Sequence, residues 1–99
     1  MATTPEGKVK ARVKALLDAK GKNLFYWMPV QSGYGRATLD FVGSYHGQYF
    51  AIETKAPGKK PTPRQELIIK EMEEAGGQVF VIWDTDGLRD LEVWLSFVP

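Results

Sequence analysis

The residues best suited to chemistry in this chain of 99 residues are Glu53 and Lys55, in the stretch YFAIETKAPGKKPTPRQ. They end an apolar run with the pattern of a buried β-strand. Strand side chains alternate between faces, so Glu53 and Lys55 share one face while Thr54 points to the other. A carboxylate at the end of a buried strand is unfavourable unless something compensates its charge. The pattern therefore predicts a partner for Glu53 at this strand end.

A second carboxylate, Asp40, lies in the preceding apolar segment, which we expect to pair with the Glu53 strand as an antiparallel hairpin. Two neighbouring carboxylates repel each other, and one stays protonated unless a cation lies between them. A divalent ion bound by Asp40, Glu53 and the backbone carbonyl of Thr54 would resolve this conflict, with waters completing the coordination. Lys55 would then reach the attacking water or a phosphate oxygen.

A third carboxylate, Glu6, opens the first expected helix on the same face as the apolar residues Val9 and Val13. From this position it is an additional candidate ligand for the same ion. The alternative is that an acid in the first helical turn only interacts with the helix dipole, typically worth ~0.3–1 kcal/mol. The residues alone leave both explanations open.

Composition limits the other kinds of site. The chain has no cysteine and a single histidine, His46, which excludes disulfides, thiolate chemistry and metal sites rich in cysteine or histidine. A bound metal is therefore held by oxygen, which indicates magnesium, manganese or calcium. The length predicts one domain over residues 1–99. No apolar stretch approaches the length of a membrane span, and the start does not resemble a secretory signal, so we expect a cytoplasmic protein without membrane contact.

Hydrophobic periodicity and turn residues predict an α/β fold with a mixed sheet flanked by helices. The expected order is helix, three strands, helix, strand, helix. The expected elements are a helix from Thr4-Pro5 to Gly21, strands at 24–30, 39–43 and 49–55, a helix at 62–75, a strand at 78–83 covered on both faces, a turn at 84–87 and a helix at 88–95.

The segment LD at 39–40, followed by IETK at 52–55, resembles the Asp…Glu-x-Lys core of the PD-(D/E)xK nuclease superfamily. Glu6 and TPRQ at 62–65 narrow the resemblance to the VRR-NUC family, whose small stand-alone members occur in phages and bacteria. The likeness runs from Glu6 to the last helix, and the element order agrees with the family's restriction-endonuclease-like αβββαβα core. One position departs from the family, because Leu39 stands where a proline usually precedes the aspartate.

This resemblance implies a metal-dependent DNA endonuclease. Asp40 and Glu53 would bind Mg²⁺ or Mn²⁺, Lys55 would assist the nucleophile, and Glu6 and Gln65 would complete the site. The location implied is the cytoplasm of a bacterial or phage-infected cell.

Gln65 also has a purely structural explanation, because Thr62-x-x-Gln65 is a capping box that would hold Gln65 at the start of its helix. We expect one role to exclude the other, since one side chain would have to face either the cap or the metal. We favour the role in the site.

Basic residues are concentrated in the first two thirds of the chain: residues 1–36 carry a net charge of +5, residues 37–64 carry +2 and residues 65–99 carry −6. This distribution suits contact with a polyanion. Such contacts position a nucleic-acid strand without reading its sequence, so we expect selectivity for DNA structure. The candidate phosphate contacts are Lys8, Arg12, Arg36, Lys59, Lys60 and Arg64. The large aromatics Tyr26, Trp27, Trp83 and Trp94 are expected in the core or a dimer contact rather than as base-stacking surfaces.

Stand-alone family members of this size resemble Holliday-junction resolvases, which implies a homodimer acting on a four-way or otherwise branched junction. Two alternatives remain open. One is a flap or single-strand nuclease, which differs in loop geometry and quaternary structure. The other is a non-catalytic nucleic-acid-binding module on the same fold, which would not need an intact set of acids and lysine.

Overall fold

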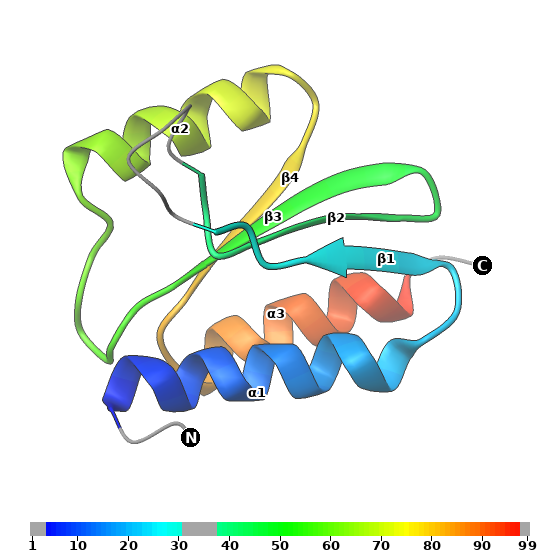
Figure 1. The fold of residues 1–99 in the computed structure, drawn as a ribbon, viewed down its shortest axis with the longest axis horizontal. Coiled ribbons are helices and arrows are strands. Elements are labelled where there is room, and N and C mark those ends of the chain that lie inside the picture. Colours follow the sequence, from blue (N-terminus) through cyan, green and yellow to red (C-terminus); the bar gives the residue numbers. More distant parts are fainter. Residues whose placement is uncertain (1–3, 31–37, 98–99) are drawn as a thin grey trace.

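The structure is a computed structural model, and it describes residues 4–30 and 38–97. Within these residues three helices and four strands follow one another in the order expected from the sequence. Figure 1 shows α1 and α3 side by side on one face of the sheet and α2 on the other. The elements are α1 (Pro5–Lys20), β1 (Leu24–Trp27), β2 (Phe41–Tyr45), β3 (Gln48–Thr54), α2 (Pro63–Glu74), β4 (Gln78–Ile82) and α3 (Thr85–Ser96).

The strands form one mixed sheet in the order β1-β2-β3-β4. The first three strands are antiparallel, and β4 pairs parallel to β3 after the crossover through α2. A two-residue turn joins β2 to β3, and its residues His46 and Gly47 both have positive φ, 51° and 80°. This is the backbone geometry of a type I′ turn, whose twist matches that of the flanking strands. The expected hairpin is confirmed, and His46 lies in its turn.

Side chains alternate between the two faces of the sheet along each strand, so the core has two parts, one on each face. The larger part packs α1 and α3 against the sheet, with Phe41, Phe50 and Ile52 among its fully buried residues. The smaller part lies under α2 and centres on Val42 and Ala51. The residues of β3 that face α2 are therefore Ala51 and Glu53, and Glu53 lies at the end of that apolar row.

Local signals explain where the first two helices begin. Thr4 and Thr62 each accept a hydrogen bond from a backbone N–H in the first turn, and a proline occupies the start of each helix. Val9, Val13 and Leu17 of α1 are buried, as the periodicity predicted. The α2 helix packs less deeply and has no fully buried residue. The N-terminal ends of α1 and α2 lie on the same side of the molecule, at the left of Figure 1.

The structure corrects several expected boundaries. The second strand begins at Phe41, so Asp40 lies in a bend before it, and the first strand ends at Trp27. The expected turn at 84–87 is instead the start of α3, because the Asp84 side chain accepts the Gly87 N–H and caps the helix. Leu67 of α2 is apolar but 61% exposed.

The approach of β1 to β2 depends on Gly43. A Cβ atom at this position would lie 2.2 Å from the backbone oxygen of Phe25 and 2.8 Å from Cβ of Tyr26. Only glycine allows the two strands to pair at this distance. Among the described helices, none combines the length and the apolar character that crossing a membrane requires.

Candidate active site

A cleft of about 320 Å³ is lined by residues from the C-terminal end of β3 and from the N-terminal ends of α1 and α2. Four separate segments of the chain contribute to it. Its lining contains all five residues expected to be catalytic. The lining residues are Glu6, Thr38, Asp40, Glu53, Lys55, Thr62, Arg64, Gln65 and Ile68.

Glu53 is the most deeply buried acid in the cleft, with 3% of its surface exposed. Its Oε2 atom accepts a hydrogen bond from Gln65 Nε2 at 2.9 Å and lies 3.5 Å from Lys55 Nζ. Burial and, to a lesser extent, the negative charge of Asp40 together raise the pKa of Glu53 to about 7, while Lys55 opposes both effects. Glu6 adds a smaller contribution that also raises this pKa. The protein therefore holds this carboxylate in a place where its negative charge is poorly stabilised.

Asp40 is fixed by partners on two other elements. Its Oδ2 atom accepts hydrogen bonds from the backbone N–H of Thr54 at 3.0 Å and from the Thr54 hydroxyl at 2.7 Å. Its Oδ1 atom lies 3.5 Å from Nζ of Lys10 on α1. Because Asp40 precedes β2 rather than belonging to it, its carboxylate can reach across the end of that strand to Thr54.

Gln65 faces both the helix cap and Glu53, although we expected its side chain to face either the cap or the site. Its Oε1 atom accepts the N–H of Thr62 at 3.0 Å, which completes the capping box. Its Nε2 atom donates to Glu53. A carboxamide carries an acceptor and a donor on opposite sides, so one side chain can serve both. The bond from Thr62 also fixes which end of the amide faces Glu53.

Two side-chain groups of the site were not predicted from the sequence, the Lys10 amine and the Thr54 hydroxyl. Lys10 lies four positions after Glu6 and hence on the same face of α1, so helical spacing could have indicated it. The hydroxyl of Thr54 carried no comparable signal. Its contact with Asp40 depends on where β2 begins, and the strand pattern did not locate this boundary.

The basic residues expected to contact phosphate do not all lie at the cleft. Arg64 lines it. Lys59 and Lys60 are exposed in the loop between β3 and α2, and Lys8 is exposed on α1. Arg12 lines a different hollow between α1 and α3, and Arg36 lies outside the described residues.

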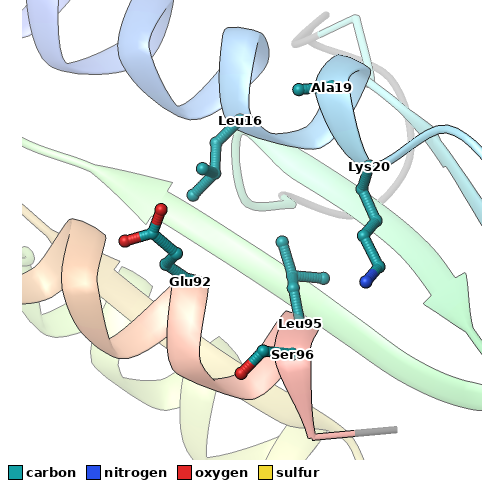
Figure 2. A pocket seen from close by; sticks show the side chains of 6 residues that line it. All are labelled: Leu16, Ala19, Lys20, Glu92, Leu95 and Ser96. Carbon is teal, nitrogen blue, oxygen red and sulfur yellow. The ribbon is translucent and has the colours of Figure 1, made fainter. Parts of the chain in front are cut away.

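Another hollow, of about 250 Å³, lies between the C-terminal halves of α1 and α3. Figure 2 shows Leu16, Ala19 and Lys20 entering it from α1, and Glu92, Leu95 and Ser96 from α3. The charged groups of Lys20 and Glu92 do not point toward each other. This mainly apolar lining offers no cluster of reactive groups, so the β3 cleft is the better candidate for an active site.

The donor atoms in the cleft suit a hard divalent cation. Glu53 Oε1 takes no hydrogen bond from the described residues, so it is available as a ligand. The N–H and C=O groups of one strand residue point to the same neighbour, so the Thr54 carbonyl faces the Asp40 side, as its N–H does. In residues 4–30 and 38–97 no group of three or more acidic or histidine side chains could hold a metal ion. Mg²⁺ commonly uses one or two carboxylates and keeps several waters, so Asp40, Glu53 and the carbonyl fit this ion.

Comparison with known proteins adds no assignment. No protein-family model matches the chain, and no curated protein matches it either.

Proposed function

We propose that this protein is a divalent-metal-dependent nuclease that hydrolyses phosphodiester bonds in DNA, on a PD-(D/E)xK core of the VRR-NUC type. The observation that carries the proposal is the environment of Glu53. It is buried beside a second carboxylate and a lysine in an open cleft, and its pKa is raised to about 7. A structural ion pair has no need of the second carboxylate. A cation bound between Glu53 and Asp40 makes the same arrangement favourable.

In this proposal Asp40, Glu53 and the Thr54 carbonyl hold Mg²⁺ or Mn²⁺. When bound, the ion supplies a water of lowered pKa and neutralises charge on the phosphate. Lys55, 3.5 Å from Glu53, orients the attacking water or contacts a phosphate oxygen. Gln65 holds the Glu53 carboxylate in place, and Arg64 contacts the phosphate backbone at the mouth of the cleft.

The carboxylates of Glu53 and Asp40 are held by hydrogen bonds and ion pairs from several helices and strands. This arrangement also argues against a module that only binds nucleic acid. Such a module gains nothing from burying Glu53 next to Asp40, because phosphate is repelled by both. Lys10 and Thr54 hold Asp40 in place, which is the support that a metal ligand requires.

For the substrate we propose branched DNA, with a homodimer cutting two strands of a four-way junction symmetrically. The second candidate is a nuclease for flaps or single strands. The exposed aromatic side chains on β1 favour it, because they suit unpaired bases.

The test is cleavage of a labelled four-way junction, a linear duplex, a flap and a single strand, each with Mg²⁺, Mn²⁺ or EDTA. Glu53→Gln removes the proposed ligand charge and keeps the shape of the side chain. Glu66→Gln, the same change at an exposed acid in the first turn of α2, is the matched control.

We expect metal-dependent cutting that Glu53→Gln abolishes and Glu66→Gln leaves intact. The DNA that is cut fastest decides between junction and flap or single strand. Folded wild-type protein that binds these DNAs and cuts none of them with either metal would favour the binding module. Equal activity of wild type and Glu53→Gln would refute the site.

A further inference from the structure

Two aromatic side chains on β1 are exposed on the sheet face that carries the candidate active site. Phe25 is 69% exposed and Trp27 is 50% exposed. Their ring centroids are 5.9 Å apart and the rings are tilted by 46°. The intervening residue Tyr26 points to the opposite face, where it packs against Phe41. The two rings therefore stand next to each other on the α2 side of the sheet.

The helix on this face does not cover them. The α2 helix packs through Ile68, Ile69 and Met72 against residues of β2, β3 and β4. The first strand lies at the edge of the sheet beyond β2. Tyr26 and Trp94 pack in the core, as their aromatic character suggested, but Trp27 does not.

The strand register gives the position of the two rings relative to the cleft. Trp27 lies opposite Val42, and Val42 lies opposite Ala51. Glu53 is two residues farther along β3 on the same face. Two strand spacings and two residue rises put the Cα atoms of Trp27 and Glu53 about 12 Å apart, with Phe25 one further pleat away.

We propose that Phe25 and Trp27 form a stacking surface for unpaired nucleobases of a strand whose backbone passes through the Glu53 cleft. The choice of nucleic acid as the ligand rests on the proposed function. Exposed planar rings bind any unpaired base through its π face. In a duplex the faces of the bases are already stacked, so the surface selects single-stranded or splayed regions.

The size of the surface favours bases over a second copy of the chain. A side chain of this kind buries about 150–250 Å² when fully covered, and both rings are already partly covered. Together they offer a few hundred Å² at most, whereas a stable interface buries roughly 800 Å² on each partner. Two stacked bases match the available area, and continuity with the cleft places them on a strand that the cleft can bind.

The test measures binding separately from cleavage. Fluorescence anisotropy in EDTA follows a labelled oligothymidylate about twelve nucleotides long and a duplex of equal length. The variants are Phe25→Ala with Trp27→Ala, and Trp27→Phe, which keeps a ring. The matched control replaces two other exposed apolar residues by alanine, Val93 in α3 and Phe97 directly after it. All four positions are exposed, so the variants should fold, and circular dichroism checks this.

We expect the double β1 variant to bind oligothymidylate about 10- to 100-fold more weakly and to bind the duplex as wild type does. Trp27→Phe should lose much less, and the α3 control should lose nothing. Equal losses on single strand and duplex, no loss at all, or no binding of oligothymidylate by wild type would each overturn the inference. So would a wild-type dimer, seen by sedimentation, that the double variant disperses without a change in affinity.

The outcome is independent of the nuclease test. If wild type cuts nothing but the double variant loses affinity for oligothymidylate, the stacking surface stands and the nuclease proposal fails. If wild type cuts DNA and the double variant binds oligothymidylate normally, the nuclease proposal stands and the stacking surface fails.

Discussion

Replacing Glu53 by glutamine should change how the stability of the metal-free protein depends on pH. The pKa of Glu53 rises from an ordinary value of 4.5 to about 7, mainly because the side chain is buried. Between these two pH values the folded chain retains a proton that the unfolded chain has lost. The free energy of unfolding therefore falls as pH rises through this window. Each pKa unit corresponds to ~1.36 kcal/mol, so ionised Glu53 lowers the stability by about 3 kcal/mol once the pH is above 7.

Glutamine does not titrate, and its carbonyl oxygen can still accept the hydrogen bond from Gln65. Urea denaturation in EDTA at several values between about pH 4 and pH 8 measures the free energy of unfolding of both proteins. We expect Glu53→Gln to gain about 3 kcal/mol relative to wild type across this range, with most of the change between pH 4.5 and 7. Glu66→Gln, at an exposed position, provides the comparison for an ordinary glutamate.

Parallel curves for wild type and Glu53→Gln would refute the claim that burial and Asp40 disfavour the charge on Glu53. A second measurement tests the link with metal. Saturating Mg²⁺ at pH 8 should stabilise wild type and leave Glu53→Gln nearly unchanged, because only the carboxylate gains a counter-charge. Equal stabilisation of wild type and Glu53→Gln by Mg²⁺ would show that the Glu53 carboxylate does not bind the metal.

Substitutions at four further positions test the supports of the site and of the sheet. Thr54→Val removes the hydroxyl that donates to Asp40 and should weaken Mn²⁺ binding about tenfold in a titration. Thr54→Ser should restore the affinity for Mn²⁺. A valine variant that binds Mn²⁺ as tightly as wild type would contradict this role of the hydroxyl. Thr62→Ala should cost about 1 kcal/mol in urea denaturation and leave cleavage unchanged, whereas Gln65→Ala should also slow cleavage. Equal cleavage rates of the Thr62→Ala and Gln65→Ala variants would show that Gln65 has no part in the reaction. Gly43→Ala should cost about 3 kcal/mol in the same denaturation assay, because its Cβ would collide with the neighbouring strand, and a loss below about 1 kcal/mol would contradict the close approach.

The order of the elements and the composition of the cleft could be predicted because both depend on local rules. Alternation along β3 put Glu53 and Lys55 on one face, and helical spacing put Glu6 on the inner side of α1. The capping threonines marked the starts of α1 and α2. These features need no knowledge of how the elements pack.

Two other features could not be predicted, because they depend on where elements end and on what lies opposite them. Asp40 bonds to Thr54 only because β2 begins one residue after Asp40. In the strand LFYW, the aromatic residues Tyr26 and Trp27 were expected in the core or in a dimer contact. Its outer side chains are exposed because β1 lies at an edge that α2 does not reach. Both the Asp40–Thr54 contact and the exposure of the β1 side chains depend on how the elements pack in three dimensions. The local sequence pattern does not encode this packing.

The amide of Gln65 has a consequence for motion in the site. Its oxygen accepts the Thr62 N–H while its nitrogen donates to Glu53, so opening the first turn of α2 also releases Glu53. Exchange of the Thr62 amide hydrogen with solvent requires the same opening. Its exchange rate, measured with and without Mg²⁺, therefore reports how often the proposed ligand leaves its working position. This backbone proton allows the site to be followed without labelling the protein or adding a substrate.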